Sequence, residues 1–327
     1  IMTYEGSERL PVNAGSYQVV ATVRDANYEG SASATMTIAK APQKITFKAL
    51  KARTFGDADL SPGAMASSKI PVSYVSSNTG VAEITGDKLH IVGAGTAVIT
   101  ASQAGDSNYL AAEPVQQTLM VNKAPATVTL GGLDQTYDGK PKAASALTTP
   151  AGLKVTIAYD GKDAVPVNAG SYPVVGTVQD ANYEGNAKAT MRIARAPQTI
   201  TFDALAAKTF GDVEFSPGAM TSAGLALSYK SSDPTVATVS EGKIRIIGAG
   251  TATIAVAQAG DSNHLPAAPV QKTIVVNKAP AAVTLSGLAY TYDGKPKPAT
   301  STTTPGGLTV KITYDGKDKA PVNAGSY

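Results

Sequence analysis

The stretch "GSYPVVGTVQDANYEGNAKATMRIA", residues 170–194, decides the fold class. Apolar residues stand at every second position in its first half and again in its second half. Between the halves lies the polar run 180–185, whose Asp, Asn and Gly residues are typical of a turn. Alternation with period two predicts strands that bury one face and expose the other, as in an antiparallel sheet. This stretch therefore predicts two strands joined by a turn.

The rest of the chain shows the same pattern. Residues 155–159 alternate and run into Asp160-Gly161, a dipeptide favoured in hairpins. Further strands are predicted at 225–229 and 243–246, with turns at 231–234 and 248–250. Apolar residues nowhere keep a helical period over three turns. Short strands with frequent turn signals indicate an all-β chain of two-sheet sandwich domains.

The chain is internally periodic. The phrase "VNAGSY" occurs at 12–17, 167–172 and 322–327, so that Tyr17, Tyr172 and Tyr327 follow one another at intervals of 155 residues. Such a period dictates the architecture of a chain. Lys/Arg-Ala-Pro junctions at 40–42, 123–125, 195–197 and 278–280 divide each period into a longer and a shorter part. We therefore expect five domains of two alternating types: a partial short-type domain 1–40, a long-type domain 41–123, a short-type domain 124–195, a long-type domain 196–278 and a partial short-type domain 279–327.

The joints between these domains carry prolines at Pro42, Pro125, Pro197 and Pro280. Proline fixes φ and removes a hydrogen-bond donor, so a sheet cannot continue through such a joint, and little slack remains between strands. We expect an extended rod. The end pieces 1–40 and 279–327 are incomplete copies of 124–195. They indicate either a window from a longer periodic chain or chains that complete each other head to tail by strand complementation.

Composition excludes several classes of protein. The net charge is only +3 and no basic cluster stands out, which disfavours nucleic-acid binding. No run of 18 apolar residues exists, so we expect no membrane insertion in this segment. Cysteine is absent, so there is no disulfide framework. With 43% hydrophobic residues, the chain can still bury cores.

Two sequence motifs resemble known families. The segment "LALSYKSSDPTVATVSEGKIRIIGAGTATIAV" at 225–256 resembles bacterial Ig-like domains. The strings "YDGKPK" at 137–142 and 292–297, with "PVNAGSY" and "VQDANYEG" within 166–185, resemble MBG-type modules of large bacterial surface and secreted proteins. These resemblances imply an extracellular, tandem-domain stalk or adhesin at the bacterial cell surface, and they carry no catalytic residue.

The repeated phrase has a structural interpretation. A tyrosine that opens a strand after a tight turn can place its ring in the sandwich and bond its hydroxyl to nearby backbone, as in the tyrosine corner. We expect this role for Tyr17 and Tyr172. Gly15 and Gly170 supply the preceding turn, where Gly170 is free to take a positive φ.

Recurring acidic residues are the candidates for a metal site. Asp25 with Glu29, Asp180 with Glu184, and the pair Asp106 and Asp261 each recur at the repeat offset. Carboxylates at domain junctions could bind calcium. The alternative is that they close turns through hydrogen bonds to their own backbone. We expect turns and no cofactor, because the spaced ligands of a calcium loop are absent.

Catalytic chemistry is not indicated. His90 and His264 do not recur at the repeat offset, which disfavours a Ser-His-Asp triad and a histidine zinc site. Gly93-Ala94-Gly95 and Gly248-Ala249-Gly250 lack the third glycine of a phosphate loop and precede strands. The expected function is a stalk or fibre that spans distance from the cell surface, with neighbouring repeats as partners and possible self-assembly into a fibre. The alternative is an adhesive module that binds glycan or protein directly, although only Tyr109 and Tyr290 among the tyrosines fall outside the repeat.

Overall fold

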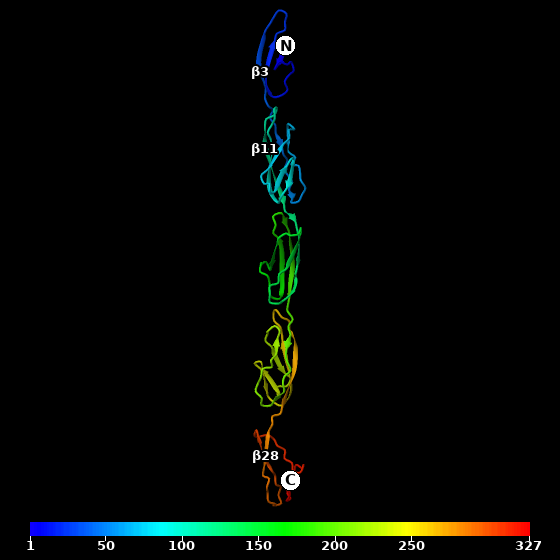
Figure 1. Cartoon of the computed structure of the whole chain (residues 1–327), viewed down its shortest axis with the longest axis vertical. Helices are drawn as coiled ribbons and strands as arrows, with labels where there is room; N and C mark the ends of the chain where they lie inside the picture. Colours follow the sequence, from blue (N-terminus) through cyan, green and yellow to red (C-terminus); the bar gives the residue numbers. More distant parts are fainter. The chain divides into compact units, whose positions relative to one another are not determined.

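The computed structural model describes all residues, 1–327, and consists of strands without a helix (Figure 1). The chain divides into two compact units, which are described separately below. Unit 1 comprises Ile1–Gln135 and Gly139–Ile193, and unit 2 comprises Thr136–Asp138 and Ala194–Tyr327. The prediction of an all-β chain is confirmed.

Unit 1 begins with a three-stranded antiparallel sheet in the order β1-β2-β3. Its strands are β1 (Met2–Tyr4), β2 (Gly15–Thr22) and β3 (Ser31–Ile38). Met2 pairs with Ala21, and Gly15 pairs with Ile38.

The 41–123 segment of unit 1 forms a sandwich around one core. Its strands are β4 (Ile45–Thr46), β5 (Arg53–Thr54), β6 (Met65–Ala66), β7 (Ser73–Ser76), β8 (Ala82–Thr85), β9 (Lys88–Ile91), β10 (Gly95–Gln103) and β11 (Ala112–Asn122). The main sheet has the order β5-β11-β10-β7, and the pairs β4-β6 and β8-β9 complete the domain. Leu89, Ile99 and Leu119 are fully buried between these layers.

The 124–193 part of unit 1 forms a second sandwich. Its strands are β12 (Ala124–Pro125), β13 (Thr127–Gly131), β14 (Asp134–Thr136), β15 (Ser145–Thr149), β16 (Val155–Tyr159), β17 (Gly170–Val178), β18 (Tyr183–Glu184) and β19 (Asn186–Ala194). The sheet β14-β19-β17-β16 is accompanied by the pairs β13-β15 and β12-β18. Val174 and Met191 are fully buried, as the alternation in 170–194 predicts.

The predicted Asp160-Gly161 turn is confirmed. Both residues have positive φ, 49° and 73°, as a type I′ turn requires. Tyr159 and Lys162 close the turn with reciprocal backbone hydrogen bonds of 2.7 and 2.9 Å.

Unit 2 contains the second long-type sandwich and the last segment of the chain. Its strands are β20 (Ile200–Thr201), β21 (Lys208–Thr209), β22 (Met220–Thr221), β23 (Ser228–Ser231), β24 (Ala237–Ser240), β25 (Lys243–Ile246), β26 (Gly250–Gln258), β27 (Ala267–Asn277), β28 (Ala282–Ser286) and β29 (Thr300–Thr304). The main sheet has the order β21-β27-β26-β23, around a core that includes Ile244, Ile254 and Ile274. The pairs β20-β22, β24-β25 and β28-β29 are two-stranded. The strand predicted at 243–246 is β25 with the same limits.

Candidate functional site

The tyrosines of the repeated phrase each bond to backbone four residues earlier. The Tyr172 hydroxyl donates to the Asn168 carbonyl at 2.8 Å, and Tyr17 donates to Asn13 at 2.8 Å. The ring of Tyr172 is half-buried at the start of β17. This is the geometry of a tyrosine that pins the turn before its own strand.

The prediction of a positive φ at Gly170 is wrong. Neither Gly15 nor Gly170 has a positive φ. Instead, the tyrosine ring lies over the glycine: a Cβ added to Gly170 would lie 3.3 Å from the Tyr172 hydroxyl oxygen. At Gly15 the corresponding distance to the hydroxyl oxygen of Tyr17 is 3.4 Å. At both positions the tyrosine ring therefore packs on the glycine, and the glycine is not left-handed.

The recurring aspartates bond to their own turns. The carboxylate Oδ1 of Asp180 accepts from the backbone N–H groups of Asn182 and Tyr183, at 2.8 and 3.0 Å. Asp106 and Asp261 each accept two N–H groups in the same way, and Asp25 accepts one from Asn27. These hydrogen bonds close turns, which is one of the two roles that the sequence analysis considers for these aspartates.

The recurring acids do not form a cluster. The structure holds no group of three or more His, Cys, Asp or Glu side chains that could bind a metal ion. Glu184 pairs through its backbone with Pro125, in the short parallel ladder between β12 and β18. The 183–184 strand was not predicted, because the sequence indicates only a turn there.

The joint at Lys123-Ala124-Pro125 lies against the 180–184 loop. The Lys123 ammonium donates to the Asp180 carbonyl at 2.6 Å, and the Ala124 N–H donates to the Asn182 carbonyl at 2.8 Å. Ala126 continues the ladder by donating to the Glu184 carbonyl at 2.7 Å. The joint and the loop run so close together that a Cβ on Gly185 would lie 2.1 Å from the Ala126 carbonyl oxygen, which explains the glycine.

The joint at Lys40-Ala41-Pro42 uses the same contacts. Lys40 donates to the Asp106 carbonyl at 2.7 Å, and the Ala41 N–H donates to the Asn108 carbonyl at 2.8 Å. In unit 2, the Ala196 N–H donates to the Asn263 carbonyl at 2.8 Å. Pro42, Pro125 and Pro197 thus follow alanines whose N–H groups bind an Asp-x-Asn loop, whereas no such bond accompanies Pro280.

A buried pair of glutamines lies beside the first joint and was missed by the sequence analysis. The Gln43 side chain donates to Gln103 Oε1 at 2.5 Å and to the Leu110 carbonyl at 2.6 Å. Gln43 Oε1 in turn accepts from the Ser68 hydroxyl. The signal that could have found this network is the recurrence of Ala-Pro-Gln at 41–43 and 196–198.

In the second copy, the Gln198 side chain bonds Gln258 Oε1 at 2.6 Å and the Leu265 carbonyl at 2.8 Å. However, Ala223 stands at the repeat position of Ser68, and Gln198 Oε1 is buried without a partner. The same network is thus complete in one copy and one bond short in the other.

Each histidine pairs with a different aspartate; His90 is exposed and His264 is half-buried. His90 Nδ1 lies 2.6 Å from Asp59 Oδ1, and His264 Nδ1 lies 3.0 Å from Asp261 Oδ1. The His264 ring also meets the Tyr137 ring edge to face, with centroids 5.2 Å apart. Neither pair is accompanied by a nucleophile that would make a triad.

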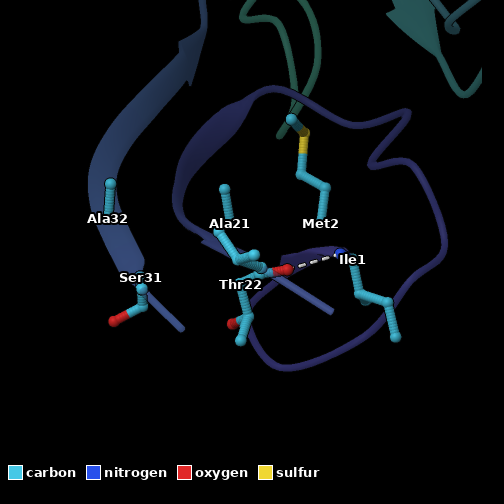
Figure 2. Close-up of a pocket in the computed structure, with 8 residues that line it drawn as sticks. Ile1, Met2, Ala21, Thr22, Ser31 and Ala32 are labelled. Atoms are coloured by element: carbon cyan, nitrogen blue, oxygen red, sulfur yellow. Dashed lines mark hydrogen bonds between the residues drawn. The ribbon is translucent and has the colours of Figure 1, made fainter. Parts of the chain in front are cut away.

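A cavity of about 570 Å³ lies on the first sheet (Figure 2). Figure 2 shows its lining from all three strands, with the Ile1 N-terminal ammonium donating to the Thr22 carbonyl at 2.7 Å. Ala21 of this lining stands at the repeat position of Gly176, which is buried beneath Leu130 of β13 in the intact copy. The cavity is therefore the inner face of a sandwich sheet, and we assign it no ligand.

The structure has no helix of the length and apolar character that crossing a membrane requires. No curated protein matches the sequence.

Among solved structures, the immunoglobulin domains 1–5 of Sidekick-1 align with a TM-score of 0.33 and 13% identity, covering 85% of this chain and 74% of that one. Domains EC1–4 of Drosophila N-cadherin align with a TM-score of 0.25 and 10% identity, covering 83% and 85%. Domains 1–6 of the surface layer protein SbsC align with a TM-score of 0.27 and 15% identity, covering 92% of this chain and 50% of that one. These likenesses concern the fold alone.

Family models match the chain directly. The model described as MBG domain matches residues 1–42, 126–197 and 281–327. The model described as intimin, immunoglobulin-like domain matches residues 219–260. The chain thus carries three segments that match the MBG domain model and one segment that matches the intimin immunoglobulin-like domain model.

Proposed function

We propose that this chain is a structural segment of an extracellular bacterial protein, a stalk or fibre that spans distance from the cell surface. The observation that carries the proposal is the construction of the joints. At 122–127, β11 ends at Asn122, β12 covers Ala124–Pro125 and β13 begins at Thr127, so that only Lys123 and Ala126 of this joint lie outside a strand. A joint of this kind has little slack.

The residues that recur in each copy support the proposal through their contacts. Tyr172 pins a turn, Asp180 closes a loop and Lys123 bonds that loop at the joint. Catalysis would require a nucleophile, a base and an orienting group that converge on one cavity. The recurring side chains bind backbone groups of turns and joints instead, which fits a spacing role.

Small-angle scattering of the 327-residue chain tests the proposal. Strands of up to 11 residues, at about 3.3 Å per residue, give domains of roughly 30–40 Å, so four domain lengths in line would measure about 120–160 Å. A particle with a radius of gyration near 20 Å, as expected for one globule of this length, would contradict a stalk. Binding of glycans or host proteins by the same chain would favour the adhesive module instead.

A further inference from the structure

Two loops of unit 1 present the same side chain to the segment that precedes them in the chain. Asn182 Oδ1 accepts the backbone N–H of Ala94 at 2.9 Å, and Asn108 Oδ1 accepts the backbone N–H of Ala14 at 2.8 Å. The two alanines occupy corresponding turns, Gly93-Ala94-Gly95 and Asn13-Ala14-Gly15, each just before the penultimate long strand of its own segment. The two loops belong to different domain types, yet they make the same contact.

The backbone of each asparagine loop is held by three hydrogen bonds. Asp180 fixes the backbone N–H of Asn182, Ala124 fixes its carbonyl, and Lys123 bonds the neighbouring carbonyl of Asp180. With the backbone of the loop bonded in this way, the Asn182 side chain is placed against the preceding turn. Asp106, Ala41 and Lys40 hold Asn108 in the same way.

The second joint adds an apolar contact to this bond. The rings of Phe55 and Tyr183 meet edge to face, with centroids 5.4 Å apart and an interplanar angle of 83°. Tyr183 follows Asn182 directly, and Phe55 donates its N–H to the Asn122 carbonyl at the end of β11. The polar and the aromatic contacts therefore restrain the same loop against the same preceding segment.

We infer that the Asp-x-Asn loops at 106–108 and 180–182 are the docking elements of the first two joints, and that Asn108 and Asn182 each position a domain on the Ala-Gly turn of the domain before it. At both joints the partner is a backbone N–H of a turn, so the alanine side chain is not read. At the first joint the Asn108 amide also donates to Asn13 Oδ1 at 3.1 Å. This inference deepens the proposed function and rests on it, since it explains how a stalk resists bending at its joints.

Hydrogen exchange of the Ala94 amide in the full chain measures the docking bond directly. A neutral hydrogen bond contributes about 1 kcal/mol, so Asn182→Ala should accelerate exchange at Ala94 on the order of five-fold. Asn182→Asp keeps an acceptor at Oδ1 and should stay within about two-fold of the parent chain. Asn27→Ala is the matched control, because Asn27 lies in the equivalent Asp25-x-Asn27 loop and accepts no turn N–H from another segment.

Two results would overturn the inference. One is unchanged exchange at Ala94 in Asn182→Ala. The other is equal acceleration at Ala94 and at the core amides of Val174 and Met191, because the side chain would then hold its own domain together and not the joint. Asn108→Ala, read out at the Ala14 amide, repeats the test on the other domain type.

A distance measurement separates this inference from the stalk proposal. The chain has no cysteine, so Lys51→Cys and Lys188→Cys, both exposed, can carry a pair of spin labels across the second joint. Asn182→Ala should broaden the distance distribution relative to Asn27→Ala. An equally narrow distribution in both would reject docking through Asn182, while scattering of the unlabelled chain decides the stalk role independently.

Discussion

The Tyr172 hydroxyl donates to the Asn168 carbonyl at 2.8 Å, and between the two lies Gly170, whose backbone the ring covers. The same bond occurs between Tyr327 and Asn323 at 2.9 Å. One side chain thus closes the turn and packs on its glycine, and this makes Asn-Ala-Gly-Ser-Tyr a single structural unit.

Removing the hydroxyl tests the bond. Tyr172→Phe should lower the unfolding free energy of its domain by about 1 kcal/mol, because the Asn168 carbonyl loses its partner while the ring stays. Hydrogen exchange of the buried Met191 amide in the full chain reports the free energy of that domain separately. Tyr17→Phe, which removes the matching bond in the first segment, should leave exchange at Met191 unchanged. No change at Met191 in Tyr172→Phe would show that the bond adds nothing.

Adding a methyl group to Gly170 tests the close approach. Gly170→Ala should cost about 1 kcal/mol through crowding against the ring, and this cost should largely disappear in a Tyr172→Ala background. Gly139→Ala is the contrasting control, since Gly139 has a φ of +79° and no atom within 4 Å of the added Cβ. Its cost comes from backbone strain and should not depend on Tyr172. An undiminished cost of Gly170→Ala in the double variant would refute the contact.

The unequal glutamine networks yield a paired prediction. Ser68→Ala should destabilise the 41–123 segment by about 1–3 kcal/mol, because Gln43 Oε1 becomes buried without a partner. Ala223→Ser should stabilise the 196–278 segment by about 1 kcal/mol, because it supplies the missing donor to Gln198 Oε1. Hydrogen exchange of the buried Ile99 amide reports the stability of the 41–123 segment, and exchange of the buried Ile254 amide reports that of the 196–278 segment. If Ser68→Ala and Ala223→Ser changed stability in the same direction, the interpretation of the two glutamine networks would be contradicted.

Alternation in the sequence predicts the strands well because it depends only on which face of a sheet is buried. The strand at 243–246 and the inward residues Val174 and Met191 follow from it. The contacts of Asn182 could not be predicted, since its partner Ala94 is far away in sequence and bonds through backbone. The prediction of a positive φ at Gly170 fails for a similar reason. The packing of the Tyr172 ring on Gly170 depends on the side-chain conformation of the tyrosine, which the sequence pattern does not give.

Acid should weaken the 231–235 turn of one copy only. Hydrogen bonds from the Thr235 hydroxyl, at 2.6 Å, and from the Thr235 N–H, at 2.9 Å, hold the pKa of Asp233 below its ordinary value of 3.8. A depressed pKa in the folded state means that this stabilisation is complete above the unfolded pKa and is lost as the pH falls through the folded pKa. The corresponding residue of the other copy is Asn78, which does not titrate.

The measurement is an NMR pH titration of the Asp233 carboxyl in the full chain, together with its Thr235→Val variant. Losing the hydroxyl should raise the pKa of Asp233 towards 3.8, because the strongest bond to the carboxylate is gone while the backbone N–H remains. Asp233→Asn should remove the acid sensitivity of the turn and leave the Asn78 turn unaffected. A pKa that does not move in Thr235→Val would show that the hydroxyl does not hold the carboxylate in solution.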